Sequence, residues 1–166
     1  MPTRSVTPVQ SSPTRSALAL AAWLALSFAA AAAGGFFMPG DWYAHLQKPT
    51  WNPPNWIFGP VWTTLYTMMA IAAWLVWKRG GFAGQRVALS LFLVQLFFNT
   101  LWSPLFFGLH HPALAFVDIA LLWLALLGTV GAFWKARPPA GALLVPYLAW
   151  VTFASALNFA IWRMNR

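Results

Sequence analysis

The sequence contains no cysteine and only two acidic residues, Asp41 and Asp118. Without cysteine the chain can form no disulfide, no thiolate metal site and no covalent haem attachment through a CxxCH motif. Charged residues make up only 7% of the chain, against about 25% in a typical soluble domain. So few charges cannot cover a water-exposed surface, and we therefore expect most of the chain to lie in lipid.

Several catalytic and nucleotide-binding signatures are missing as well. The chain has no GxGxxG, Walker A, HExxH or GxSxG motif. Its histidines, His45, His110 and His111, all fall between the apolar runs, where a solvated imidazole is more common than a haem-iron ligand. No nucleophile is placed beside a base. The sequence therefore predicts no metal site, no required cofactor and no hydrolytic chemistry.

Long apolar runs are what the sequence does have. Hydrophobic residues make up 60% of the chain, and five stretches reach the roughly 20 residues that span a hydrocarbon core. These stretches are residues 17–37, 56–77, 87–109, 112–134 and 138–162. They are too long for barrel strands and do not alternate in polarity, so backbone bonding in lipid requires helices. We predict an all-α membrane protein in which residues 17–166 form a five-transmembrane-helix bundle, with sequential helices mostly side by side.

The N-terminal region allows two interpretations. Residues 1–16 are rich in Ser, Thr and Pro, which predicts a disordered tail. Arg4 and Arg15 before an Ala-rich stretch also fit a cleaved signal peptide. The apolar run continues through Phe36 and Phe37 to about full spanning length, and this favours a retained transmembrane helix.

The positive charges indicate an orientation. With five spans, one face of the membrane carries seven Lys or Arg residues and the other carries three. The first face holds Arg4, Arg15, Lys78, Arg79, Arg86, Lys135 and Arg137, and the second holds Lys48, Arg163 and Arg166. The positive-inside rule then predicts an integral, multi-pass protein with its N-terminus in the cytoplasm and its C-terminus outside. The net charge of +8 is explained by the same rule and by anionic lipid head groups, without nucleic acid.

The first loop, residues 38–55, combines tryptophan with proline. Trp42 and Trp51 lie within it and Trp56 directly follows it, in the string DWYAHLQKPTWNPPNW. Four prolines stiffen the loop by fixing φ, at positions 39, 49, 53 and 54. A stiff aromatic loop favours a lid over a pocket, with Trp51 as a candidate contact. The alternative is a loop that rests among the lipid head groups.

Polar and aromatic side chains form stripes at helical spacing inside three of the runs. The stripes are Trp62 and Tyr66; Gln95, Asn99 and Trp102; and Tyr147, Trp150, Ala154 and Asn158. Asp118 is the only charge within any run, and we expect it to point inward, towards partners such as Asn99, Gln95 or Asn158. The spacing leaves two interpretations open: interhelical hydrogen bonds that hold the bundle together, or the polar groups of an aromatic-lined ligand pocket.

The same residues resemble the tryptophan-rich sensory protein/translocator protein (TspO) family, also called the peripheral-type benzodiazepine receptor family. The string WYAHLQKPTWNPPNWIFGPVWTTLY is similar to the family's signature region around the first loop and second helix. QLFFNTLWSPLFF, ALAFVD and VPYLAWVTFASALNF are similar to its third, fourth and fifth helices. The resemblance extends from about Pro39 to Asn165, in order and with matching spacing.

This resemblance implies a dimeric five-helix bundle with a pocket below the first loop. Family members bind porphyrins and haem, isoquinoline-carboxamide and benzodiazepine-type drugs and, in animals, cholesterol. By position, the implied pocket residues are Tyr43, Trp62, Tyr66, Asn99, Trp102, Trp150, Ala154 and Asn158. The resemblance therefore favours the pocket over hydrogen bonding alone.

Two departures from the family pattern matter. Phe159 stands before Arg163 where the animal cholesterol motif has a tyrosine, which puts sterol binding in doubt. The third run carries Ser90, Val94 and Phe97 where some bacterial relatives dimerise through small residues. A homodimer is still expected, but through an interface that the sequence does not identify.

The resemblance implies three functions. The first is a tetrapyrrole-binding membrane sensor or regulator, with porphyrin or haem as ligand. The second is a light-dependent porphyrin-degrading enzyme, in which Trp62 and Trp150 match the implicated tryptophans. The third is a porphyrin or sterol transporter, which is less favoured because the chain shows no inverted repeat and no series of intramembrane charges. We expect the sensor, with the bilayer and a hydrophobic small molecule as partners.

Overall fold

The computed structural model describes residues 12–166, which form helices joined by short connections and contain no strand. The elements are α1 (Pro13–Gly35), α2 (Asp41–His45), the 3₁₀ turn η1 (Asn55–Ile57), α3 (Phe58–Trp77), α4 (Gly81–Gly84), α5 (Arg86–Ser103), the π-helical turn η2 (Pro104–Gly108), α6 (Pro112–Ala136) and α7 (Pro138–Met164). Five of these segments are long and apolar enough to cross a membrane. The predicted five-helix bundle is therefore confirmed.

The first long helix starts earlier than the sequence predicts. α1 begins at Pro13, so residues 13–16, expected in a disordered tail, are helical. The side chain of Ser12 accepts a hydrogen bond from the backbone N–H of Arg15 at 3.3 Å, and proline is favourable in the first turn of a helix. The prediction of a tail was wrong for these four residues, and its remaining part at residues 1–11 lies outside the described chain.

The third transmembrane segment ends in a π-helical turn that the apolar pattern does not reveal. In η2 the N–H of Leu109 donates to the carbonyl of Pro104 at 2.8 Å, a bond five residues back. The wider turn changes the direction of the side chains that follow Trp102, and it buries Phe106. Single π turns of this kind often occur at functional sites.

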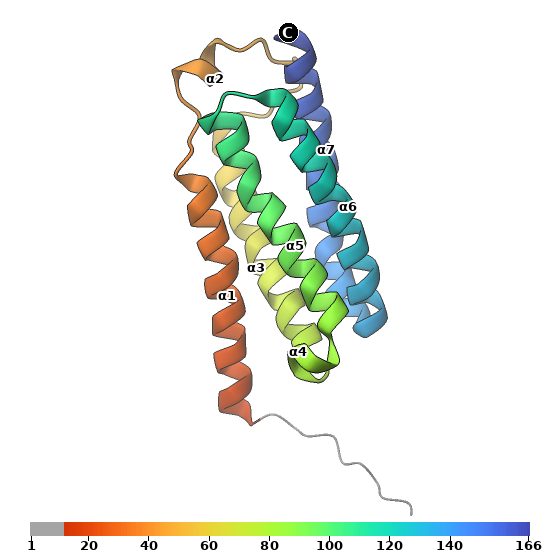
Figure 1. Ribbon diagram of the computed structural model, residues 1–166. Helices are drawn as coiled ribbons and strands as arrows, with labels where there is room; N and C mark the ends of the chain where they lie inside the picture. Colours follow the sequence, from red (N-terminus) through yellow and green to blue (C-terminus); the bar gives the residue numbers. More distant parts are fainter. Residues whose placement is uncertain (1–11) are drawn as a thin grey trace, which may run out of the picture.

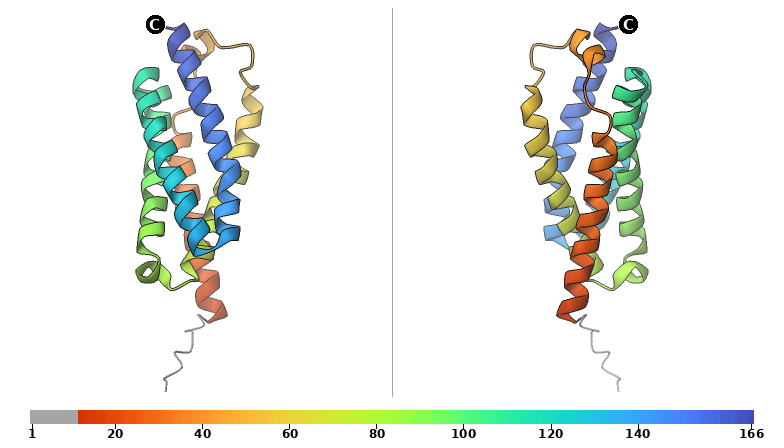
Figure 2. Two further views of the ribbon diagram at one scale, coloured as in Figure 1. Left: turned by 90° about the vertical axis from the view of Figure 1, so that its right-hand side faces the viewer. Right: turned by 90° about the vertical axis from the view of Figure 1, so that its left-hand side faces the viewer.

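The long helices form a closed ring rather than a simple sequential row. α1 packs against α3 and α5, α3 against α7, α7 against α6, and α6 against α5 (Figures 1 and 2). Three sequential pairs are therefore neighbours, as expected, whereas α3 and α5 touch little because α1 lies between them. The C-terminus and α2 lie at one end of the bundle, and α4 and the start of α1 lie at the other (Figure 1).

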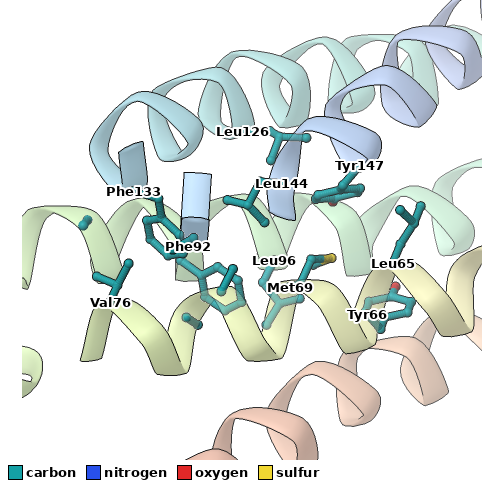
Figure 3. Close-up of a cluster of buried hydrophobic side chains, with 14 of the residues drawn as sticks. Leu65, Tyr66, Met69, Val76, Phe92, Leu96, Leu126, Phe133, Leu144 and Tyr147 are labelled. Atoms are coloured by element: carbon teal, nitrogen blue, oxygen red, sulfur yellow. The ribbon is translucent and has the colours of Figure 1, made fainter. Parts of the chain in front are cut away.

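The core is densest where α3, α5, α6 and α7 converge. Met69, Phe92, Phe133, Leu144 and Tyr147 are fully buried there (Figure 3). The rings of Phe92 and Phe133 stack with their centroids 5.9 Å apart. These contacts hold the four helices together and leave the end nearer α2 for the site described below.

Candidate ligand-binding site

A cavity of about 830 Å³ lies under the first loop, between the five long helices. Its volume is within the range of about 300–1,000 Å³ that is usual for small-molecule pockets. Eleven aromatic side chains line it: Phe28, Phe37, Tyr43, Trp56, Phe58, Trp62, Tyr66, Trp102, Phe106, Phe107 and Trp150. A flat, largely apolar molecule fits the chemistry of this wall.

The structure brings most of the predicted site residues to this one cavity. Those that line it are Tyr43, Trp62, Tyr66, Asn99, Trp102, Trp150, Ala154 and Asn158. They come from α2, α3, α5 and α7, so the stripes seen in separate runs face a common space. Two further predicted residues, Trp51 and Asp118, do not line it.

Trp51 lies behind the wall instead of in it. Its side chain is 48% exposed, and its ring packs edge-on against Phe153 with the centroids 5.8 Å apart. Phe153 in turn lies 5.5 Å from the ring of Trp150, which does line the cavity. Trp51 therefore supports the position of Trp150 from outside.

A chain of hydrogen bonds crosses the bundle at the floor of the cavity. The hydroxyl of Tyr66 donates to Oδ1 of Asn99, and Nδ2 of Asn99 donates to the hydroxyl of Tyr147 at 2.9 Å. Tyr147 then donates to Oε1 of Gln95 at 3.0 Å. The chain links α3, α5 and α7, while Tyr66 and Asn99 also face the cavity. The two interpretations of these polar residues, hydrogen bonding between helices and pocket lining, thus apply to the same side chains.

A second polar contact lies on the wall between α5 and α7. Nε1 of Trp102 donates to Oδ1 of Asn158 at 2.9 Å, and Nδ2 of Asn158 donates to the carbonyl of Pro112 at 2.8 Å. Trp102 also stacks on Phe106, with centroids 4.9 Å apart. One amide therefore fixes an indole of the wall and ties α7 to the start of α6.

Asp118 behaves differently from the prediction. It is buried, as expected, but neither of its carboxyl oxygens has a hydrogen-bond partner among the described residues. Two of the expected amide partners are used elsewhere: Asn99 bonds to tyrosines, and Asn158 bonds to Trp102 and Pro112. The amide Nε2 of Gln95 has no partner and does not bond to Asp118 either. The predicted pairing of Asp118 with these amides was therefore wrong.

The first loop covers the cavity and is fastened at both sides. Tyr43 of α2 is buried, lines the cavity, and donates to Oδ1 of Asn52 at 3.4 Å. Burial raises the pKa of the Tyr43 phenol above its usual value, and the hydrogen bond to Asn52 opposes this shift in part. The phenol therefore stays protonated near neutral pH. The ammonium of Lys48 lies 4.5 Å from the centroid of the same ring.

The C-terminus of α7 holds the loop in place. The side chain of Asn165 accepts from the backbone N–H of Gln47 at 2.9 Å and donates to the backbone carbonyl of Gln47 at 2.9 Å. On the other side, the ring of Trp42 stacks on His110 with centroids 4.4 Å apart. His110 has φ of +52°, a backbone conformation that is unusual for a residue other than glycine. These contacts place the loop over the cavity.

The histidines take structural roles. His45 Nδ1 lies 2.6 Å from the carbonyl of Asp41, His110 stacks on Trp42, and His111 caps α6 by accepting from the N–H of Leu114. None of the three is among the lining residues of the cavity. Within residues 12–166 no group of three or more His, Cys, Asp or Glu side chains could hold a metal ion.

Sequence reasoning missed two parts of the wall. α1 contributes Phe28, Ala31 and Gly34, and η2 contributes Phe106 and Phe107. A Cβ on Gly34 would make ordinary van der Waals contact with Oγ of Ser103, at 3.4 Å, so the end of α1 lies beside the end of α5. The buried Ser27 is the one polar residue within residues 17–35, and a single serine does not form a stripe that marks the inner face of α1.

This fold and cavity define the class of protein: a polytopic membrane bundle that encloses an aromatic site under a fastened loop. The TspO/MBR family model matches residues 18–163, nearly the whole chain, and the chain belongs to that family. It is an integral, multi-pass membrane protein.

Known relatives agree with this assignment. The chain is 45% identical over 140 residues to "Protein CrtK" of Rhodobacter capsulatus, which covers 82% of this chain and 86% of that protein. It is 45% identical over 137 residues to the human "Translocator protein", covering 80% and 81% of the two chains. It is 44% identical over 143 residues to the "Tryptophan-rich sensory protein" of Cereibacter sphaeroides, covering 86% and 89%.

Proposed function

We propose that this protein is a membrane-embedded tetrapyrrole sensor or regulator that binds a porphyrin or haem in the aromatic cavity under the first loop. The observation that carries the proposal is the composition of the wall. Aromatic rings from every long helix except α6, and from the loop, surround a space of about 830 Å³. A tetrapyrrole is a flat aromatic ring system, and stacking on tryptophan and tyrosine is the contact that such a ligand favours.

The polar groups of the cavity would orient the macrocycle. Asn99 and Asn158 lie on the wall, and both are fixed by hydrogen bonds to neighbouring helices. Lys48 lies over the ring of the lining residue Tyr43, and its positive charge suits the propionates of a porphyrin. Arg163, near the end of α7, is the second candidate for such a contact. The bound molecule would then present its apolar ring to the bundle and its acids to the loop.

Binding is tested by titrating the purified protein with protoporphyrin IX in the dark and following the absorption spectrum. The proposal predicts a saturable shift of the main porphyrin band with a stable bound spectrum. A spectrum that equals that of porphyrin in empty detergent micelles at all protein concentrations contradicts it.

One arrangement favours enzymatic porphyrin degradation as a second candidate. Trp62 and Trp150, the two tryptophans implicated by the family resemblance, both line the cavity. Indole is oxidisable, so either ring could pass an electron to a photoexcited ligand. Under light, loss of the porphyrin spectrum that requires the protein supports the enzyme, whereas a stable spectrum supports the sensor.

A further inference from the structure

Positive charges gather at the α4 end of the bundle with no acidic side chain to balance them. This end carries Arg15, Lys78, Arg79, Arg86, Lys135 and Arg137. The two acids of the chain lie elsewhere: Asp41 is in α2 at the opposite end, and Asp118 is buried inside the bundle. No acidic side chain of the protein therefore neutralises the charges at the α4 end.

These cations are not equivalent. The guanidinium of Arg15 lies 5.9 Å from the Trp77 ring, and the ammonium of Lys78 lies 4.6 Å from the Trp74 ring. Among residues 12–166, the side chains of Arg79 and Arg137 have no hydrogen-bonding or aromatic partner, and the same holds for Arg86 of α5 and Lys135 of α6. Arg86 and Lys135 both line the same groove, which has a volume of about 570 Å³.

The shape of this groove suits a compact anion. Its other walls are mostly small residues: Ala83, Gly84, Ala88, Ala132 and Ala136. Gln85 and Val87 are the other residues that line it. An arginine and a lysine that line one open groove are the side chains that proteins commonly use to bind phosphate.

The surroundings of the groove indicate where the phosphate comes from. The groove lies between the start of the α5 span and the end of the α6 span, at the boundary of the hydrocarbon region. Val87 is 73% exposed beside Arg86, and Trp134 is 48% exposed beside Lys135. A free phosphate gains nothing from these apolar side chains, whereas the acyl chains of a lipid can cover them.

We propose that the groove between Arg86 and Lys135 binds the phosphate of an anionic phospholipid head group, whose acyl chains lie against the outer faces of α5 and α6. Anionic lipid is richer in the cytoplasmic leaflet, and the cation count predicts that this end faces the cytoplasm. The site lies at the opposite end of the bundle from the aromatic cavity, so it does not depend on porphyrin binding. Its effect is to hold the α4 end at the head-group layer.

The test is a titration of the purified full chain, in a neutral detergent, with phosphatidylglycerol, the bound lipid being counted by native mass spectrometry. Replacing both groove cations, Arg86→Gln with Lys135→Gln, should weaken binding about tenfold or more. The matched control is Arg79→Gln with Arg137→Gln, which removes the same charge at the same end from residues outside the groove. It should weaken binding by no more than about threefold. Arg86 and Lys135 lie in the terminal turns of α5 and α6, and Arg79 and Arg137 lie in the connections between helices. Circular dichroism confirms that each variant keeps its helices.

Three results would overturn the proposal. Equal weakening in both double variants would mean that only the overall charge of this end attracts lipid. Equal binding of phosphatidylcholine would mean that the anionic character of the lipid is not recognised. Inorganic phosphate that binds as tightly as phosphatidylglycerol, with the same sensitivity to the groove substitutions, would assign the site to free phosphate.

Discussion

The indole of Trp102 and the amide of Asn158 are joined by a 2.9 Å hydrogen bond that connects α5 to α7 at the wall of the cavity. The same amide also donates to the carbonyl of Pro112 at 2.8 Å, so one side chain connects three helices. The aromatic wall therefore depends on a buried polar residue, and this dependence can be tested.

Asn158→Leu should destabilise the bundle. Interhelical hydrogen bonds in membranes contribute about 0.6 kcal/mol each on average, and a buried group left unpaired costs about 1–3 kcal/mol. We expect the free energy of unfolding to fall by about 1–2 kcal/mol, measured by denaturation in mixed micelles. The control is Thr152→Val, which removes the bond from Trp123 and a bond to the Leu148 carbonyl within α7, both on the exposed face, and should cost less. Equal costs would contradict the role assigned to Asn158.

Asn165→Ala should loosen the first loop. This side chain makes both hydrogen bonds to Gln47, and both use the backbone atoms of Gln47. The change should therefore raise the dissociation rate of bound porphyrin by about three- to tenfold, since such effects fall mainly on dissociation. Stopped-flow displacement measures the rate. Gln47→Ala keeps the backbone atoms, so porphyrin should dissociate from this control as it does from the unchanged protein. A faster rate in the control would mean that the bonds to Asn165 are not what holds the loop.

The orientation in the membrane can be measured directly. The cation count predicts that a reporter fused after Arg166 appears on the outer side and that one replacing residues 1–3 stays in the cytoplasm. With five spans, the start of α1 and the C-terminus lie at opposite ends of the bundle and so on opposite sides of the membrane (Figure 1). If both reporters appear on one side, the first span has been removed or does not cross the membrane.

Trp150→Phe separates the sensor from the enzyme. Phenylalanine keeps an aromatic face and most of the contact area, so binding should fall only modestly. If the indole only stacks on the porphyrin, any light-dependent loss should persist in proportion to the porphyrin bound, and this is the result we expect. Porphyrin that is bound normally but no longer consumed in light would instead show that the indole takes part in electron transfer. Trp62→Phe is measured in parallel because Trp62 lies across the same cavity.

The parts of the site that follow from local spacing could be predicted from the sequence. Trp62 and Tyr66, or Trp150 and Ala154, are one turn apart and so share a helix face whatever the rest of the bundle does. The aromatic residues of η2 could not be placed in this way, because the π turn at Pro104 changes the period that the prediction assumes. Phe28 was missed for a different reason, since the buried Ser27 is the one polar residue within residues 17–35 and a single serine is a weak mark of an inner face.

The polar partners show a further limit of sequence reasoning. Helix spacing indicates that Gln95 and Asn99 face inward, but it cannot show that tyrosines from α3 and α7 meet them. Asp118 was predicted to form hydrogen bonds with those amides, and in the structure it forms none with them. Such pairings depend on the rotation and depth of separate helices, which the ring order of the bundle determines.

The central claim is that the cavity under the first loop is where porphyrin binds, and Ala154 tests it most directly. Ala154 lines the cavity between Trp150 and Asn158, whereas Ala156, two residues further along α7, is exposed on its outer face. A threonine at position 154 overpacks the wall, which costs about 1–3 kcal/mol, and each 1.4 kcal/mol is a factor of ten in affinity. Titration with protoporphyrin IX in the dark should therefore give a Kd about tenfold higher for Ala154→Thr and unchanged for Ala156→Thr. Equal affinity in all three well-folded proteins would contradict the account.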